Sequence, residues 1–277
     1  MEDLGNFARL VEAIRPWLSH LVIVGGWAHR LHRFHPLATS QVYQPLRTRD
    51  VDLAFSLNAP LEGDLGDALK QAGFEEELSG EHTPPVTHYY LGEEDAGFYA
   101  EFLTVKQGSG IKRDGKLDLT ISRAGITAQK LRHLELLLAG PWKVQVGVES
   151  NVPIERAVDL VVPNPVSFII QKLLIHKHRD TAKKAQDVLY IHDTLELFGA
   201  SLDQLRSVWE GEVMPKMSPK TAKGALMTAS ELFENVTDTI RNAVRIPQDR
   251  NLQPDNLRAA IHYGLNEVLG LGAGSNS

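Results

Sequence analysis

Two short stretches, VIVGGWAHRLHR (residues 22–33) and RTRDVDLAF (residues 47–55), decide the fold that we expect for this chain. The first begins as an apolar, β-rich run and breaks at Gly25-Gly26 before a helical pattern. In the second, Asp50 and Asp52 alternate with apolar residues, so on a strand their side chains leave the same face. Two carboxylates so close repel each other unless a cation lies between them, and Mg²⁺ prefers such hard oxygen ligands. The sequence therefore predicts a metal site at Asp50 and Asp52.

The glycine pair suggests what the metal is for. Gly25 and Gly26 allow a tight turn and a close approach of the backbone to a ligand, because neither carries a Cβ atom. The helix that follows them presents free N–H groups to an anion. We therefore expect a diphosphate to rest at this turn.

The GG turn followed by DVDL resembles the nucleotidyltransferase superfamily of DNA polymerase beta, whose members hold an NTP on a Gly-Gly or Gly-Ser turn and bind metal through an Asp-x-Asp strand. The resemblance implies that Gly25 and Gly26 hold phosphate and that Asp50 and Asp52 bind metal. It also implies a third carboxylate on a later strand, and the segment FYAEFLTV offers Glu101. Trp27 stands where Ser or Thr is commoner, and this GGWA form occurs in antibiotic nucleotidyltransferases.

The composition is that of an ordinary globular protein. With 277 residues, 43% of them hydrophobic and 23% charged, the chain can bury a sizeable core and form two domains. The absence of cysteine excludes disulfides, thiolate catalysis and Cys-type zinc sites. No apolar run approaches the ~20 residues of a transmembrane helix, and the start MEDLGNFARL is acidic rather than signal-like. We expect a cytoplasmic protein with no membrane partner.

The distribution of charge matters more than its sum. A net charge of −6 argues against a basic nucleic-acid binder overall. Basic side chains nevertheless gather in residues 29–49, which include Arg47 and Arg49, and in residues 172–184, which include Lys172. Either cluster could hold a triphosphate or an RNA end, and the alternative for each is a solvated helix face.

The pattern along the chain predicts an α/β (α+β) fold, in which a mixed-sheet N-terminal domain precedes a helical C-terminal domain. Pro163-Asn164-Pro165 marks the boundary, because Asn164 suits a helix cap and Pro165 the first helical position. We expect a nucleotidyltransferase domain at residues 1–163, a helical domain at 164–270 and a flexible tail at 271–277. The predicted helices include 3–17, 61–72, 127–139 and 219–245, the predicted strands 20–24, 50–56, 87–92, 97–105, 144–148 and 157–162, and the predicted loops 106–126.

The helical half supplies a second resemblance. KLLIHKHR (172–179) followed by KKAQDVLYIHD (183–193) resembles the C-terminal motif of abortive-infection type nucleotidyltransferase toxins, in which a Lys helix precedes a Lys-Asp helix. This implies that Lys172 contacts the triphosphate and that Asp187 orients Lys172 or the acceptor. The alternatives are a surface lysine and an ordinary helix-surface salt bridge between Lys184 and Asp187.

The reaction implied is transfer of an NMP from an NTP to an acceptor hydroxyl. Two Mg²⁺ ions, or Mn²⁺ in their place, would be bridged by Asp50 and Asp52. Glu101 would bind the ion on the nucleophile side and accept the hydroxyl proton. Lys172, Arg49 and Arg47 would neutralise the charge that grows on the pyrophosphate.

Three acceptors or roles stay open at this stage. One is RNA, with tRNA ends the usual target among similar proteins, in a toxin that has a separately encoded antitoxin. A second is an antibiotic of aminoglycoside type, favoured by GGWA and by the acidic segments 75–77 and 93–95. A third is a nucleotide-binding module without catalysis. A zinc site at His29, His32 and His35 is disfavoured, because no partnering acid accompanies these histidines.

Overall fold

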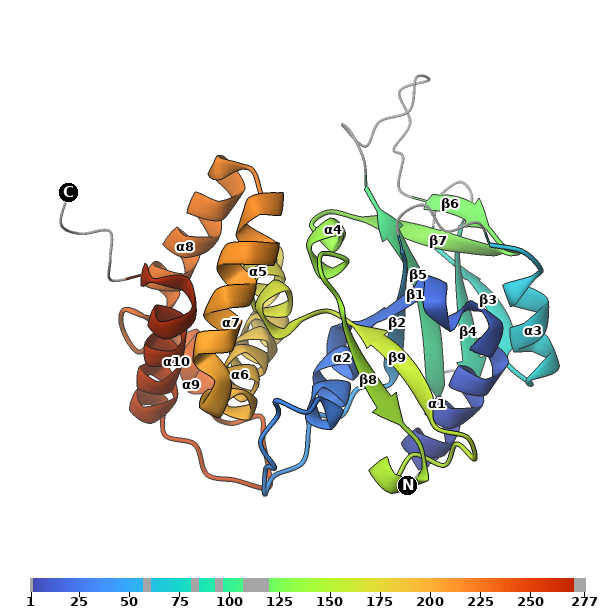
Figure 1. Ribbon diagram of the computed structural model, residues 1–277, viewed down its shortest axis with the longest axis horizontal. Coiled ribbons are helices and arrows are strands. Elements are labelled where there is room, and N and C mark those ends of the chain that lie inside the picture. Colours follow the sequence, from blue (N-terminus) through green and yellow to red (C-terminus); the bar gives the residue numbers. More distant parts are fainter. Residues whose placement is uncertain (1, 57–60, 81–84, 93–96, 107–119, 272–277) are drawn as a thin grey trace. The chain divides into compact units, whose positions relative to one another are not determined.

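A computed structural model describes residues 2–56, 61–80, 85–92, 97–106 and 120–271 (Figure 1). By its internal contacts the chain forms two compact units. The first contains residues 1–35 and 47–163, and the second contains residues 36–46 and 164–277. The chain therefore passes from one unit to the other at residues 35–36, 46–47 and 163–164. No helix in the described part of the chain is both long and apolar enough to cross a membrane.

The first unit is built on a mixed sheet, which confirms the predicted α/β fold. Its strands run in the order β1 (Leu21–Val24), β2 (Asp50–Phe55), β5 (Phe98–Val105), β4 (Val86–Leu91) and β3 (Glu75–Ser79). β2 and β5 are parallel, whereas β1 pairs antiparallel with β2 and β4 antiparallel with β5. The last residues of β5 also pair with β7 (Ile126–Leu131), which pairs in turn with β6 (Thr120–Arg123).

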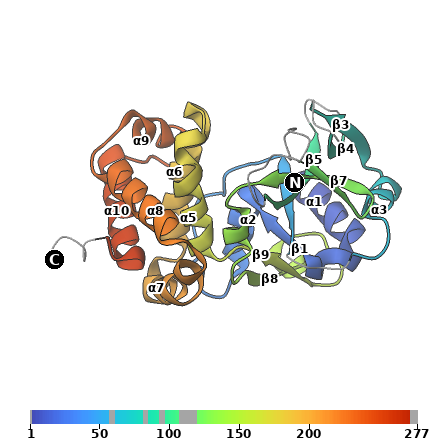
Figure 2. The same cartoon turned by 90° about the horizontal axis from the view of Figure 1, so that it is seen from above.

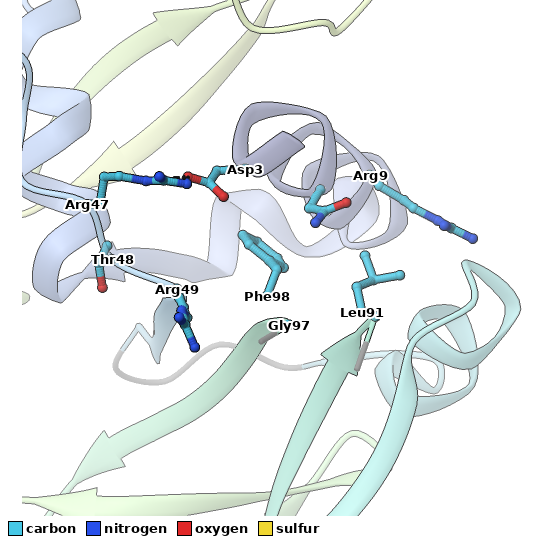
Figure 3. A pocket seen from close by; sticks show the side chains of 10 residues that line it. Asp3, Arg9, Arg47, Thr48, Arg49, Leu91, Gly97 and Phe98 are labelled. Carbon is cyan, nitrogen blue, oxygen red and sulfur yellow. Dashed lines mark hydrogen bonds and ion pairs between the residues drawn. The ribbon is translucent and has the colours of Figure 1, made fainter. Parts of the chain in front are cut away.

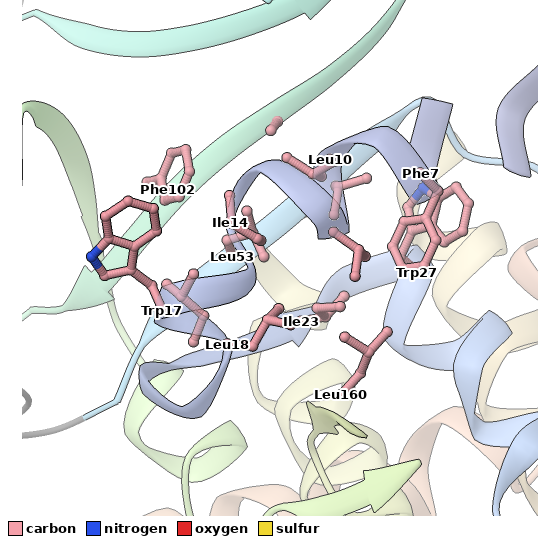
Figure 4. Packing of buried hydrophobic residues seen from close by; sticks show 14 of the residues in the cluster. Phe7, Leu10, Ile14, Trp17, Leu18, Ile23, Trp27, Leu53, Phe102 and Leu160 are labelled. Atoms are coloured by element: carbon pink, nitrogen blue, oxygen red, sulfur yellow. The ribbon is translucent and has the colours of Figure 1, made fainter. Parts of the chain in front are cut away.

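One face of this sheet is buried in the main core. Helices α1 (Glu2–Ala13) and α2 (Gly25–Leu31) cover it, and Phe7 stacks on Trp27 with 4.0 Å between ring centroids (Figure 4). Leu53 of β2 and Phe102 of β5 belong to the same cluster. The opposite face carries a smaller apolar cluster that ends at the short helix α4 (Leu134–Leu137). Side chains of β2 and β5 that do not enter the main core must therefore leave toward this second face.

Other elements of the first unit add buried residues to the main core. They are the helix α3 (Leu65–Gln71) and a separate two-stranded sheet of β8 (Trp142–Val146) and β9 (Val158–Val162). Asp64 caps α3 by accepting a hydrogen bond of 2.8 Å from the backbone N–H of Asp67.

The second unit is helical, as predicted, and Figure 2 labels its helices. They are α5 (Pro165–Ile175), α6 (Thr181–Leu197), α7 (Leu202–Val208), α8 (Pro219–Phe233), α9 (Asp238–Ala243) and α10 (Pro254–Leu269). Asn164 caps α5, since its side-chain oxygen accepts a hydrogen bond of 2.8 Å from the N–H of Ser167, and Pro165 occupies the first turn. The local signals in the sequence were therefore sufficient to predict where this helix starts.

Residues 36–46 belong to the helical unit although they precede the strand β2. The Tyr43 hydroxyl donates a hydrogen bond of 2.8 Å to Glu196 of α6, and the backbone N–H of Gln44 donates one of 2.7 Å to Asp249. These contacts join positions far apart in the sequence, which is why the pattern of residues 36–46 indicates only a loop.

Two predicted elements are wrong. Residues 127–139 do not form one helix, because residues 126–131 are the strand β7 and only Leu134–Leu137 are helical. Pairing with β5 and β6 buries Ile126 and Ala128, and this tertiary pairing overrides the local pattern. The predicted helix 219–245 is interrupted at residues 234–237, where Thr237 caps α9. Of the predicted loop 106–126, residues 107–119 lie outside the described residues and Thr120–Arg123 form β6.

His32 makes the stability of the first unit depend on pH. Its ring is fully buried, and Nε2 donates a hydrogen bond of 2.8 Å to the carbonyl oxygen of Pro163. Burial lowers the pKa of His32 to about 4 from its usual 6.5. Below pH 6.5 His32 therefore binds a proton in the unfolded chain but stays neutral in the folded chain. The free energy of unfolding falls as the pH falls.

We expect acidification from pH 7 to pH 4 to lower the free energy of unfolding through His32 by about 3 kcal/mol, at about 1.4 kcal/mol per pKa unit. Urea unfolding of the wild type and of His32→Gln between these pH values measures the difference. The glutamine variant keeps a hydrogen-bond donor but does not titrate, so its pH dependence should be shallower. Parallel curves for the two proteins would rule out His32 as the source.

Candidate active site

Three carboxylates leave the same face of the central sheet. In the parallel pairing of β2 with β5, Asp50 lies opposite Tyr99 and Asp52 lies opposite Glu101. Residues opposite each other on paired strands point to the same side, and so do residues two apart on one strand. Asp50, Asp52 and Glu101 are each half-buried. The structure thus places the three acids that the sequence singled out as metal ligands on one face of the sheet, although their ligand atoms do not all lie within 4.8 Å of one another.

Gly25 lies against the second of these acids. β1 pairs with β2 so that Val24 is opposite Asp52, which places the next residue, Gly25, beside the Asp52 side chain. Gly25 has a φ of +64°, and a Cβ atom there would lie 2.0 Å from Oδ2 of Asp52. Only glycine leaves room for this carboxylate and adopts the backbone conformation without strain. Gly26 follows in the first turn of α2.

Substitution of Gly25 by alanine should displace the Asp52 carboxylate. We expect Gly25→Ala to destabilise the protein by at least about 1–2 kcal/mol from the left-handed backbone alone, and to weaken metal binding as well. Thermal unfolding and titration with Mn²⁺ measure the two effects. Gly5→Ala is the matched control, because Gly5 is exposed in α1 and a Cβ atom there meets nothing within 4 Å. Equal Mn²⁺ affinity in both variants would contradict the role given to Gly25.

Polar and aromatic neighbours complete the carboxylate face. Thr48 donates a hydrogen bond to Asp50, and Nε2 of His88 on β4 lies 3.4 Å from Oε1 of Glu101. Burial raises the pKa of Tyr99, and the negative charges of Asp50 and the other two acids raise it further. Sequence reasoning missed these residues. The alternation in THYYLG could have placed His88 on one face, but not beside Glu101, because the strand order is not local information.

The donor set fits a divalent metal. Three carboxylates supply the hard oxygen atoms that Mg²⁺ takes, and a cation among them relieves their mutual repulsion. Gly25 has no Cβ atom that would push Asp52 out of this arrangement. The residues that would hold the metal are Asp50, Asp52 and Glu101.

Arg47 and Arg49 flank Thr48 just before the strand β2. They line a cavity of about 720 Å³ together with Arg9 of α1 and Phe98 (Figure 3). Arg47 is 84% exposed and forms a 2.8 Å ion pair with Asp3 of α1. Thr48, which donates a hydrogen bond to Asp50, lines the same cavity. Arg47 thus turns toward α1, whereas Arg49 directly precedes Asp50 in the chain.

Lys172 and Asp187 form a buried ion pair in the helical unit. Nζ of Lys172 in α5 lies 2.9 Å from Oδ1 of Asp187 in α6, and the two side chains are 6% and 3% exposed. Nε of Arg179 lies 3.3 Å from Oδ2 of Asp187. The ammonium group of Lys172 also lies 5.3 Å from the ring centroids of both Phe168 and Tyr190. Lys172 is thus not a surface lysine, and the position of Asp187 suits a residue that orients it.

A second cluster of possible metal ligands, in the helical unit, is already paired with an arginine. Among the described residues, only His192, Asp193 and Glu196 offer ligand atoms that all lie within 4.8 Å of one another. Both oxygens of Asp193 accept hydrogen bonds from the guanidinium of Arg250, at 2.7 and 2.6 Å. The guanidinium neutralises this carboxylate, so the group does not need a metal ion.

Comparison with known proteins defines the class. Residues 2–214 match the family model NTP_transf_8, described as nucleotidyltransferase, and the chain belongs to this family. It is therefore a nucleotidyltransferase, which confirms the class indicated by the Gly-Gly and Asp-x-Asp motifs. Among solved structures the chain is similar to MenT4, a nucleotidyltransferase toxin from Mycobacterium tuberculosis H37Rv. The identity is 11% and the TM-score 0.42, over 98% of this chain and 84% of that chain. No curated protein matches the sequence significantly.

Proposed function

We propose that this nucleotidyltransferase transfers an NMP from an NTP to a hydroxyl group at the end of an RNA. The preferred RNA is a tRNA, and the reaction depends on a divalent metal. The observation that carries the proposal is the register of β2 and β5, which aligns Asp50, Asp52 and Glu101 on one face beside Gly25. The carboxylates would hold two Mg²⁺ ions, or Mn²⁺ in their place.

In this reaction the acceptor oxygen forms a bond with the α-phosphorus, and the bond from that phosphorus to the β-phosphate oxygen breaks. The metal, when bound, neutralises charge on the phosphates and makes the acceptor hydroxyl more acidic. Glu101 accepts the hydroxyl proton, and pyrophosphate leaves. Gly25 and Gly26 let the backbone approach the phosphates without a Cβ atom in the way.

The helical unit would supply positive charge. We assign to Lys172 a contact with the triphosphate, with Asp187 orienting its ammonium group, and to the basic residues 172–184 a contact with the RNA backbone. The resemblance of this helix pair to the abortive-infection type nucleotidyltransferase toxins supports a toxin of a toxin-antitoxin or phage-defence system. A separately encoded antitoxin and a cytoplasmic location belong to the same proposal.

A second acceptor class is favoured by one specific feature. Glu75 and Glu77 on β3 pair in register with Tyr90 and His88 on β4, so they lie on the same sheet face as the catalytic acids. Negative charge at that edge suits a cationic acceptor such as an aminoglycoside. An antibiotic adenylyltransferase is therefore the alternative function.

The test is a labelling assay. The purified protein is incubated with Mg²⁺, each of the four α-labelled NTPs and total cellular RNA, beside the double variant Asp50→Ala, Asp52→Ala. Label in a tRNA-sized band that requires both aspartates would support the proposal and identify the nucleotide. Label in no RNA would reject it, and label in an aminoglycoside supplied in a parallel reaction would establish the alternative.

A further inference from the structure

The carboxylate face continues across the sheet as two rows of side chains. One row runs from Asp50 through Tyr99 and Tyr90 to Glu75, because each residue is the register partner of the next. The other row runs in the same way from Asp52 through Glu101 and His88 to Glu77. Since the partners share a face, all of these side chains project from one side of the sheet.

The middle of the two rows is aromatic. The rings of Tyr90 and Tyr99 have centroids 5.2 Å apart and planes inclined by only 31°. The His88 ring lies 6.1 Å from Tyr90 and 5.9 Å from Tyr99. All three residues are half-buried rather than part of the core, whereas their strand neighbour Tyr89 is fully buried on the other face. We call these three residues, His88, Tyr90 and Tyr99, the aromatic patch.

The position of the aromatic patch relative to the glycines indicates which substrate it serves. Gly25 lies on the Asp52 side of the carboxylates, toward β1, and the aromatic patch lies on the Glu101 side, toward β4. If the phosphates of the NTP rest at Gly25 and Gly26, the attacking hydroxyl must approach from the opposite side. The aromatic patch therefore borders the path of the acceptor and not the triphosphate.

We infer that the aromatic patch is a stacking site for the terminal base of a single-stranded RNA acceptor, next to the hydroxyl that receives the nucleotide. The inference rests on the proposed function and specifies how its acceptor is held. Tyrosine rings that are partly exposed bind bases by their faces, and such stacking is tolerant of sequence. Glu75 and Glu77 beyond the patch repel phosphate, so the backbone of the RNA must leave in another direction while only the base occupies this face.

Direct binding tests the stacking site without requiring catalysis. The probes are a short, fluorescently labelled single-stranded RNA ending in adenosine and the same RNA ending in a ribose without a base, in Mg²⁺ and without NTP. By fluorescence anisotropy we expect the wild type to bind the adenosine-ended RNA about tenfold more tightly, which is the usual order for one stacked base. Tyr90→Leu should bind both RNAs with equal, weak affinity.

Two variants serve as controls. Tyr90→Phe keeps the ring and loses only the hydroxyl, which lies 3.4 Å from Nδ1 of His88, so it should keep the preference of the wild type. Tyr263→Leu removes a tyrosine that is 62% exposed on the helical unit and should change nothing.

The possible outcomes separate this inference from the proposed function. A preference for the base that survives in Tyr90→Leu, or that is absent from the wild type, overturns the stacking site. If the base preference depends on Tyr90 but the wild type transfers no label to RNA, the stacking site stands and the proposed reaction fails. If label transfer occurs without any dependence on Tyr90, the proposed reaction stands and the stacking site fails.

Discussion

Replacement of Asp52 by asparagine is expected to slow nucleotidyl transfer by about 10³-fold or more. The change keeps the shape of the side chain but removes one of the negative charges that would hold metal beside Gly25. Loss of several kcal/mol of transition-state charge stabilisation corresponds to this factor, at about 1.4 kcal/mol for each tenfold change in rate. The measurement is the initial rate of label transfer at saturating Mg²⁺.

The control for Asp52 is an aspartate in a comparable place without the same neighbours. Asp159 lies on the strand β9, is exposed and pairs in register with Gln145, so Asp159→Asn should retain full activity. Asp52→Asn should not lower the melting temperature, because it relieves repulsion among three carboxylates. An active Asp52→Asn variant with unchanged affinity for Mn²⁺ would exclude Asp52 as a metal ligand.

The second large effect is expected at the buried ion pair. Lys172→Met should lower the free energy of unfolding by about 3–5 kcal/mol, because it leaves the Asp187 carboxylate buried without its closest cationic partner. Chemical denaturation measures this change. Lys177→Met is the matched control, since Lys177 is 68% exposed and lies 3.7 Å from Glu231 on the surface, where an ion pair contributes little.

The double variant Lys172→Met, Asp187→Leu distinguishes a structural pair from a functional one. Replacing both partners by apolar residues should restore most of the stability, because no buried charge is left without its main partner. If Lys172 contacts the triphosphate, this stable protein should still have a raised KM for the NTP. A double variant with normal stability and normal kinetics would show that the pair serves the fold alone.

Several elements were predictable because their signals are local. Asn164-Pro165 begins α5 through a cap and a first-turn proline, and both effects involve residues only a few positions apart. The alternation around Asp50 and around Glu101 correctly separated these residues from the buried apolar residues next to them, because strand periodicity is a property of the backbone. The erroneous helix at 127–139 has the opposite origin, since β7 exists through its pairing with β5 and β6.

The sequence by itself determined the class of this protein: the Gly25-Gly26 turn and the Asp50-x-Asp52 strand were sufficient to indicate a nucleotidyltransferase. Only the tertiary structure decided that Glu101 lies opposite Asp52, that Arg47 turns to Asp3, and that the aromatic patch borders the carboxylates. The physical reason is that backbone geometry sets which face of a strand a side chain leaves, whereas strand order and register depend on the packing of the whole sheet.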